Sequence, residues 1–184
     1  LTVLHRNSGK MESFNQLNSQ LVNENVYAIL PDKGGNLLLG TLSALVSFNP
    51  EKKSFTTIDK EKDGTPFTSQ RITILFRDSH KRLWVGGEEG ISVFQQEGIE
   101  IEKVPILPES SVTKTFTNCI YEAANGIIWV GTREGFYCFN EKEKKIKRYT
   151  TANGLPNNVV YGILEDTFGR LWVSTNRGIA CFNL

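Results

Sequence analysis

One short phrase recurs along this chain and constrains its fold more than any other feature. It reads Leu83-Trp84-Val85-Gly86 in one copy, Ile128-Trp129-Val130-Gly131 in the next and Leu171-Trp172-Val173-Ser174 in a third. An eroded copy around Leu38 precedes them. The copies are spaced by forty-odd residues, and a period of this length indicates an array of repeated structural units.

Each copy of the phrase predicts two strands joined by a tight turn. Residues 83–85 are apolar, rich in strand formers and followed by glycines, which is typical of a short strand. Apolar residues do not alternate with polar ones there, so both faces of the strand should be buried. A second strand is expected at residues 91–94, after the glycine-rich turn 86–90. Closely spaced glycines disfavour a helix in this region.

Two further strands complete each repeat. A further strand segment precedes each hairpin, for example within residues 23–32 and 157–166, and another strand is expected at 54–58, 99–104 and 146–149. Units of four antiparallel strands with this period are the blades of a β-propeller, whereas solenoids of similar period are helical. We therefore predict an all-β fold, a β-propeller fragment of about four blades, each a four-stranded antiparallel sheet, cut from a larger propeller.

The repeats divide the chain 1–184 as a single partial β-propeller. Residues 1–20 should supply the last two strands of a preceding blade, at 1–5 and 11–17. Blades are expected at 21–65, 66–110 and 111–153, and the first three strands of a last blade at 154–184. A closed ring of four blades is the alternative, but it leaves the strand at 1–5 without a place. An open arc would expose two blade surfaces, through which a homodimer can form.

Composition and charge exclude several classes of partner. The 21 basic and 20 acidic residues nearly cancel, so no global field attracts nucleic acid. The sequence has no apolar run long enough to cross a membrane. Cys138 and Cys181 occupy equivalent places in successive repeats and are expected to face the core. With His5 and His80 as the only histidines, we expect neither a metal site nor a cofactor.

No catalytic constellation can be assembled from this sequence. It offers no Ser-His-Asp set and no phosphate-binding glycine loop. Asp32, Asp78 and Asp166 recur at the same turn, which favours turn stabilisation over catalysis. The recurring tryptophans are expected to pack between blades rather than to stack on a sugar. The chain is therefore expected not to be an enzyme by itself.

If the propeller binds a ligand, one face is the place to look for it. The turn inside each Trp-bearing hairpin and the connection between blades should lie on the same face. Amides, carboxylates and guanidinium groups recur there and suit sugar hydroxyls and uronic carboxylates, although solvated turns are the alternative interpretation. The candidate ligand-binding residues are Arg71, Glu88, Glu89, Arg133, Glu134, Asn157, Asn158, Asn176 and Arg177.

Residues 158–179 resemble the two-component regulator propeller repeat. The pattern of that family is N-x-V-x-x-I-x-x-D-x-x-G-x-L-W-[VI]-G-T-x-x-G-[LI], and four copies in register cover nearly the whole chain. The copies depart from it at Leu38 in place of Trp, Gly87 in place of Thr, Ala123 in place of Asp and Ser174 in place of Gly.

The resemblance implies the periplasmic sensor region of a hybrid two-component histidine kinase of the kind found in gut Bacteroides. Such repeats sense glycan fragments, so an oligosaccharide ligand is expected, and a phosphorelay would carry the signal. Membrane attachment would come only from other parts of the parent protein. A dimerisation scaffold is the alternative. A propeller lyase or hydrolase fragment of the streptogramin-lyase type is disfavoured because no histidine-centred site can be assembled.

Overall fold

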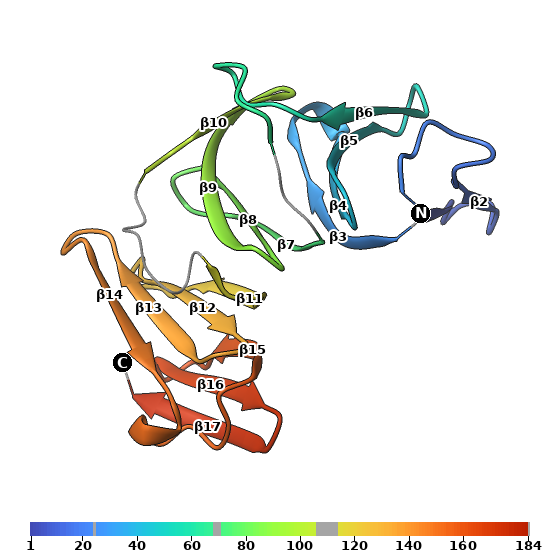
Figure 1. Ribbon diagram of the computed structural model, residues 1–184. Coiled ribbons are helices and arrows are strands. Elements are labelled where there is room, and N and C mark those ends of the chain that lie inside the picture. Colours follow the sequence, from blue (N-terminus) through green and yellow to red (C-terminus); the bar gives the residue numbers. More distant parts are fainter. Residues whose placement is uncertain (24, 68–70, 106–113, 184) are drawn as a thin grey trace.

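The structure, a computed structural model, describes residues 1–23, 25–67, 71–105 and 114–183, and the strands there form antiparallel sheets in sequence order (Figure 1). A two-stranded sheet comes first, made of β1 (Thr2–Leu4) and β2 (Met11–Ser13). The first four-stranded sheet contains β3 (Val26–Pro31), β4 (Leu37–Thr41), β5 (Leu45–Asn49) and β6 (Ser54–Ile58). The second contains β7 (Ile72–Arg77), β8 (Leu83–Gly87), β9 (Gly90–Glu97) and β10 (Glu100–Lys103).

The C-terminal half continues the same pattern. The third four-stranded sheet contains β11 (Thr117–Glu122), β12 (Ile128–Thr132), β13 (Phe136–Asn140) and β14 (Lys145–Tyr149). The last sheet has three strands among the described residues, β15 (Val160–Glu165), β16 (Arg170–Thr175) and β17 (Gly178–Asn183). Two 3₁₀ turns, η1 (Lys33–Gly35) and η3 (Thr151–Asn153), lie between strands. None of the described helices is long and apolar enough to cross a membrane.

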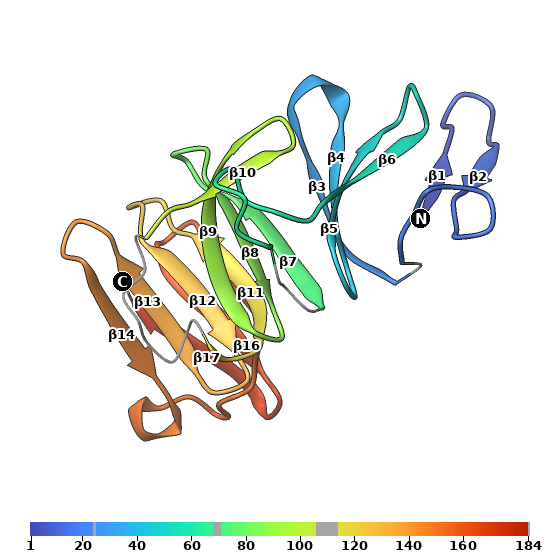
Figure 2. The same cartoon turned by 45° about the horizontal axis from the view of Figure 1, so that its top comes forward.

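The sheets follow one another along an arc. The first strands β3, β7, β11 and β15 contact each other in succession, and Figures 1 and 2 place them on the inner side of the arc. The fourth strands β6, β10 and β14 lie at the outer edge. The β1–β2 hairpin stands at one end and β15–β17 at the other. This is the blade arrangement of a β-propeller, and the predicted fold class is confirmed.

The hydrophobic core is divided into layers between successive sheets. Leu38 and Val85 meet between the first and second sheets. Trp84 packs against residues such as Tyr137 between the second and third sheets, and it is fully buried. Trp129 occupies the equivalent place between the third and last sheets. The tryptophan of each hairpin therefore faces the following sheet, which is why its strand is apolar on both faces.

Close approach between sheets requires glycine after the Trp-Val pair. A Cβ atom at Gly86 would lie 3.0 Å from Thr117 Cγ2, and one at Gly131 would lie 2.6 Å from Val160 Cγ1. Thr117 and Val160 begin the first strand of the following sheet. In the last sheet Ser174 replaces this glycine, and its cross-strand partner is Gly162. In this pair the glycine therefore lies on β15 and the side chain on β16, the reverse of the arrangement at Cys119 and Gly131.

Two expectations about burial are wrong at the last sheet. Trp172 is 38% exposed, whereas Trp84 and Trp129 are 0% and 4% exposed. Cys181 is also exposed, although Cys138 at the equivalent position is partly buried. The face that carries Trp172 has no following sheet within the described residues, so nothing covers it.

The N-terminal hairpin differs in length from the prediction for residues 11–17. β2 ends at Ser13, because Asn15 Oδ1 accepts hydrogen bonds from Leu17 N at 2.9 Å and Asn18 N at 3.1 Å and so begins a turn. Phe14 nevertheless packs onto the first sheet through Phe48 and Phe55. The expected division between residues 110 and 111 lies outside the described residues.

Candidate functional site

The candidate ligand-binding residues gather along one edge of the arc, here called the rim. The rim comprises the starts of β3, β7, β11 and β15 and the turns β4–β5, β8–β9, β12–β13 and β16–β17. In an antiparallel sheet of consecutive strands, the start of the first strand and the turn between the second and third lie at the same edge. The repeat therefore brings these segments together in every sheet.

Short-range hydrogen bonds fix the rim turns. Thr132 Oγ1 donates to Gly135 O at 3.0 Å and accepts from Glu134 N at 3.0 Å. Thr175 does the same with Gly178 and Arg177 in the last sheet. These contacts explain the Gly-Thr-x-x-Gly pattern and leave the two central side chains of each turn pointing outward.

The second sheet departs from this turn because Gly87 replaces threonine. Gly87 pairs with Gly90, so Glu88 and Glu89 form a two-residue turn. A Cβ atom at residue 87 would collide with the carbonyl oxygen of Arg71. The close approach coincides with a left-handed backbone at Arg71, whose φ is 47°. Non-glycine residues adopt this region at a cost, and such strain concentrates at ligand sites.

Arg71 is the best-defined cation of the rim. Its guanidinium carbon lies 5.9 Å from the centroid of the Tyr27 ring in the preceding sheet, and Nε lies 3.9 Å from Glu88 Oε2. Arg71 Nε is buried and has no hydrogen-bond partner among the described residues. A buried donor without a partner is costly, so this nitrogen is a ready donor for a ligand oxygen.

Arg133 lies on an aromatic ring in the third sheet. Its guanidinium carbon is 3.9 Å from the centroid of Phe116, a distance typical of stacking. The neighbouring Glu134 instead turns toward Arg148, whose Nη2 lies 3.9 Å from Glu134 Oε2. Arg148 Nε also donates to the carbonyl oxygen of Glu134 at 3.0 Å. Glu134 is therefore paired with Arg148, whereas Arg133 is exposed on the ring of Phe116.

The last sheet adds a hydroxyl-bearing ring. Tyr161 is 53% exposed, and its hydroxyl donates to Asn176 Oδ1 at 2.8 Å. Arg177 is exposed beside Asn176. Tyr161 and Asn176 thus form a second aromatic and polar pair on the rim.

Three of the candidate ligand-binding residues make contacts elsewhere. Asn157 Oδ1 accepts from Val159 N at 2.9 Å, and Asn158 Oδ1 accepts from Thr151 N at 2.9 Å. Both amides therefore shape the connection that leads into β15. Glu89 lines a cavity between the first two sheets rather than the inner part of the rim. These three side chains are not brought together with Arg71 or Arg133.

The rim aromatics were absent from the sequence prediction. Tyr27 and Tyr161 are the extra residues of β-bulges, which interrupt the register of β3 and β15 near their starts. A bulge re-aims its side chain away from the sheet. The pattern of polar and apolar residues in these strands does not reveal a bulge. The Val-Tyr pair that recurs at residues 26–27 and 160–161 could, however, have indicated a shared position for the tyrosine.

The bulges also link neighbouring sheets. Thr73 is the bulge residue of β7, and its hydroxyl donates to Thr117 O at 3.0 Å. Asn118 is the bulge residue of β11, and its amide donates to Val160 O at 2.8 Å. Each bond crosses to the first strand of the following sheet. The starts of the inner strands are therefore held in a fixed row along the rim.

The opposite edge of the arc is stabilised by the recurrent aspartates. Asp78 Oδ2 accepts from Trp84 Nε1 at 2.8 Å and Arg82 Nε at 2.7 Å, while Oδ1 accepts from Arg82 N at 2.8 Å. Asp166 makes the same three bonds with Trp172 and Arg170. The Trp172 hydrogen bond, with support from Arg170, holds the pKa of the Asp166 carboxyl well below its usual range. The expected role in turn stabilisation is confirmed for both residues.

The third sheet lacks this carboxylate. Ala123 stands at the position of Asp78, with the same turn hydrogen bond from Ala123 N to Ile127 O at 2.9 Å. In consequence Trp129 Nε1 is buried without a hydrogen-bond partner in the part of the chain that the structure describes. The departure from the family pattern at Ala123 thus has a direct structural effect.

An ion pair ties the second and third sheets at this same edge. Arg82 Nη1 and Nη2 donate to Glu141 Oε1 and Oε2 at 2.7 and 2.8 Å. Hydrogen bonding to the Glu141 carboxylate raises the pKa of Arg82, and the hydrogen bonds that Arg82 donates lower the pKa of Glu141. The pairing is bidentate, which is the strong geometry for arginine and a carboxylate.

The histidines and cysteines form no chemical centre. His80 Nδ1 lies 3.5 Å from Arg82 Nη2, and His5 Nε2 lies 3.5 Å from Glu12 Oε2 in the N-terminal hairpin. Burial raises the pKa of Cys119 to about 12, so this thiol is not poised as a nucleophile. Among the described residues, no group of three or more His, Cys, Asp or Glu side chains could hold a metal ion.

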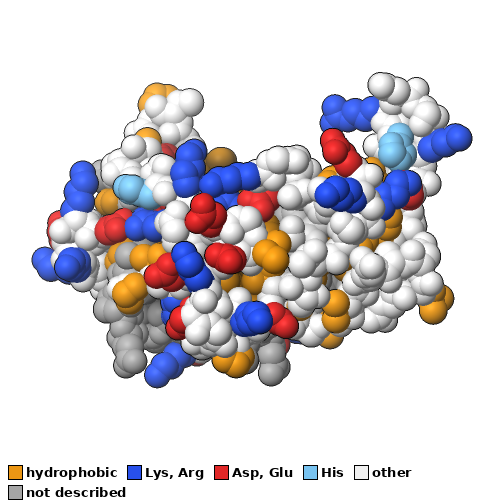
Figure 3. Space-filling view, turned by 90° about the horizontal axis from the view of Figure 1, so that it is seen from above, with side chains coloured by type: hydrophobic (Ala, Val, Ile, Leu, Met, Phe, Trp, Pro, Cys, Tyr) orange, Lys and Arg blue, Asp and Glu red, His pale blue; other side chains and the backbone are white. Residues whose placement is uncertain are grey.

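Charges are mixed over the visible surface. Figure 3 shows Lys and Arg side chains interspersed with Asp and Glu, with hydrophobic atoms between them. Neither sign dominates this face, in keeping with the formal net charge of +1. Recognition by this chain must therefore depend on local groups such as those of the rim.

Comparisons with known proteins agree with this architecture. The sequence model of the family described as "Two component regulator propeller" matches residues 110–134 and 154–177. Histidine kinase P4 of Formosa agariphila is 30% identical in an alignment of 161 positions that covers 83% of this chain and 12% of that protein. This chain thus spans about an eighth of the length of that relative.

Solved structures share the fold. The extracellular domain of BT4673 from B. thetaiotaomicron, assigned to a hybrid two component system, matches with a TM-score of 0.78 and 20% identity, covering 98% of this chain and 24% of that chain. Streptogramin B lyase matches with a TM-score of 0.59 and 17% identity over 90% of this chain and 56% of that chain. At these identities the likeness shows the propeller fold alone. The expected resemblance is confirmed: residues 110–134 and 154–177 are repeats of the two-component regulator propeller family, carried on an arc of propeller blades.

Proposed function

We propose that this chain is a ligand-sensing propeller segment of a hybrid two-component signalling protein, located in the periplasm and responding to glycan fragments. The rim is the contact surface, and the chain acts by binding rather than by catalysis. The family match and the likeness to the extracellular domain of BT4673 support the sensor assignment. The remaining parts of the parent protein would supply the membrane anchor and the kinase.

The alternation of aromatic rings and polar groups along the rim carries this proposal. Tyr27 with Arg71, Phe116 with Arg133 and Tyr161 with Asn176 lie on successive sheets. Aromatic faces accept the C–H surface of a sugar ring, while guanidinium and amide donors bind its hydroxyl or carboxylate oxygens. A fixed row of such pairs suits an extended oligosaccharide better than a compact ligand.

Ligand binding must also change the conformation that the kinase senses. A ligand shifts an equilibrium only by its difference in affinity for the two states. Arg71 Nε, which has no hydrogen-bond partner among the described residues, and the left-handed backbone at this residue mark the place where a bound ligand would gain most. Contact there is expected to alter the spacing of the first and second sheets, which meet at Tyr27 and Arg71.

The test is binding by the whole extracytoplasmic region of the parent protein. A glycan array would identify ligands, and calorimetry would compare the unaltered protein with Arg71→Ala and Arg133→Ala. Each variant is expected to weaken binding at least tenfold. Lys142→Ala, on the exposed turn at the opposite edge, is the matched control and should leave the affinity unchanged. Saturable binding that neither rim variant affects would refute the rim as the contact surface.

A second candidate function is association through an open sheet face. Leu164, Trp172 and Ile179 expose 63%, 38% and 66% of their surfaces on the last sheet. Apolar side chains grouped in this way are typical of an interaction surface. Sedimentation of the chain at increasing concentration would detect a homodimer. A Trp172→Glu variant that dimerises as well as the parent chain would exclude this face.

A further inference from the structure

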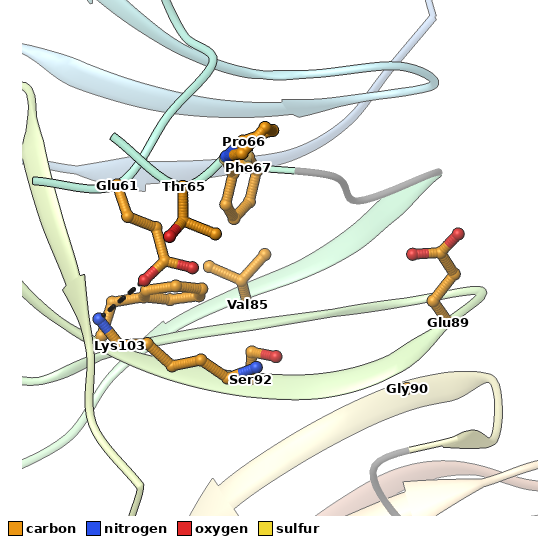
Figure 4. A pocket seen from close by; sticks show the side chains of 10 residues that line it. Glu61, Thr65, Pro66, Phe67, Val85, Glu89, Gly90, Ser92 and Lys103 are labelled. Carbon is orange, nitrogen blue, oxygen red and sulfur yellow. Dashed lines mark hydrogen bonds between the residues drawn. The ribbon is translucent and has the colours of Figure 1, made fainter. Parts of the chain in front are cut away.

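A cavity of about 320 Å³ lies on the face of the second sheet that is turned toward the first, and it reaches the rim at Glu89 in the β8–β9 turn. Its walls come from the connection that follows β6 and from strands β8, β9 and β10. Figure 4 shows Glu61, Thr65 and Phe67 on one side, and Val85, Ser92 and Lys103 on the other. This volume is at the lower end of the range for small-molecule sites, which runs from roughly 300 to 1,000 Å³.

The cavity exists because two positions that are apolar in neighbouring sheets are polar here. Ser92 lies opposite Val85, where the first and third sheets have Val46 and Tyr137. Both Val46 and Tyr137 are buried against the preceding sheet. Serine leaves that volume empty and adds a hydroxyl.

The second position shows the same exchange. Lys103 lies opposite Phe94, where the first and third sheets place Phe55 and Ile146 opposite their own phenylalanines. Phe55 and Ile146 belong to the apolar layers of those sheets. Lysine at this place replaces an apolar side chain with an exposed, charged one, and no ion pair of its ammonium group is found within the described residues.

The wall of the cavity is preformed. Glu61 Oε2 accepts from Lys103 N at 3.1 Å, and Lys62 N donates to Ile101 O at 2.8 Å, so the connection is fastened to β10. Glu61 N donates to Thr65 O at 2.8 Å, which closes the turn. Phe67 meets Phe94 edge to face with ring centroids 5.5 Å apart. A ligand would therefore meet an ordered site and lose little free energy in organising it.

The chemistry of the lining indicates the class of ligand. Carboxylates of Glu61 and Glu89, the ammonium of Lys103 and the hydroxyls of Thr65 and Ser92 are spread around the cavity. A hydroxyl group both donates and accepts, so several hydroxyls can satisfy acceptors and donors distributed in this way. The two carboxylates repel an anionic ligand, and the phenylalanine rings offer an apolar surface.

We propose that this cavity binds one neutral, pyranose-sized polyhydroxylated unit. Glu61 and Glu89 accept from ligand hydroxyls, Lys103 and Ser92 donate to its oxygens, and Phe67 contacts its C–H face. The site shares Glu89 with the rim but does not contain Arg71 or Arg133, and it does not depend on binding at those residues. Occupancy would join the second sheet to the connection that follows β6, because the ligand contacts both.

The experiment is a protein-observed NMR titration of the 184-residue chain. The probes are methyl α-D-glucopyranoside, methyl β-D-galactopyranoside and methyl α-L-rhamnopyranoside, with D-glucuronate and L-leucine for comparison. At least one neutral glycoside is expected to give saturable shifts around Ser92 and Lys103. Preference for glucuronate or leucine, or no saturable shift with any probe, would overturn the proposal.

Matched variants separate a binding site from a packing gap. Ser92→Tyr and Lys103→Ile install the side chains that fill the equivalent space in the third sheet, so both variants should fold and lose binding at least tenfold. Lys147→Ile on β14 makes the same exchange outside the cavity and should retain binding. Unchanged affinity in Ser92→Tyr, with its spectrum showing a folded chain, would refute the site.

The two proposals fail in different ways. Arg133→Ala removes a rim residue and should leave glycoside binding in the cavity unchanged. Oligosaccharide binding that is lost in Arg133→Ala but kept in Ser92→Tyr would leave only the proposed function standing. The reverse pattern would leave only the cavity.

Discussion

Removal of the Asp78 carboxylate is the sharpest test of how this arc is stabilised. Asp78→Ala takes away three hydrogen bonds at once, from Trp84 Nε1, Arg82 Nε and Arg82 N. Trp84 is fully buried and the Arg82 side chain is 10% exposed, so water cannot replace the lost acceptor. Breaking a buried charged pair costs about 3–5 kcal/mol, of which Arg82 recovers part through Glu141. We therefore expect the free energy of unfolding to fall by about 3 kcal/mol.

The last sheet supplies a matched control. Asp166 makes the same three bonds, but Trp172 is 38% exposed and the Arg170 side chain is 42% exposed. Water can solvate these donors when the carboxylate is removed, so Asp166→Ala should destabilise the chain clearly less than Asp78→Ala.

The assay is urea denaturation followed by circular dichroism, with the slope of each transition compared between variants. Equal losses in the two variants would refute the reasoning that burial sets the cost. A loss below 1 kcal/mol in Asp78→Ala, at an unchanged slope, would show that the indole and guanidinium find other acceptors.

Three further predictions concern the layers between sheets. Trp129→Ala should lower the free energy of unfolding by about 3–5 kcal/mol, as in other large-to-small core changes, and Trp172→Ala should cost at least 1 kcal/mol less; both are measured by urea denaturation. Gly131→Ala should cost about 1–3 kcal/mol, because the new methyl group would stand 2.6 Å from Val160 Cγ1, and a change in thermal midpoint near zero would contradict the close approach. Because the folded-state pKa of Glu141 is lowered below 4.5, its contribution is present above about pH 4.5 and lost as the pH falls. Glu141→Gln should therefore flatten the acid side of the stability profile between pH 5 and pH 2, and an unchanged profile would show that the pair with Arg82 contributes nothing.

The sequence alone was enough to predict the architecture. The spacing of Trp84, Trp129 and Trp172 with their trailing glycines identifies the repeat, and repeat geometry dictates four-stranded sheets stacked side by side. Burial within one sheet could not be predicted equally well, because it depends on a neighbour. Trp172 and Cys181 occupy the same repeat positions as Trp129 and Cys138, and yet they lie on an uncovered face.

The candidate site was predicted in outline only. Arg71 and Arg133 lie on the rim, but the rings beside them were missed, since bulges in β3 and β15 redirect side chains without changing the strand pattern. The inter-sheet cavity was missed as well. Ser92 and Lys103 look unremarkable in sequence, and their effect appears only when each is compared with the residue that fills the same place in another sheet.

The glycine that follows each Trp-Val pair has a consequence for how such repeats can diverge. Three sheets place a side chain on the first strand opposite this glycine, in the pairs Ala28–Gly40, Ile74–Gly86 and Cys119–Gly131, and the last sheet has Gly162 opposite Ser174. The space at this crossing admits one side chain, from either strand. The two positions should therefore change together during evolution. The larger side chain can pass from the first strand to the second only if the first-strand residue becomes glycine when the second-strand glycine is replaced.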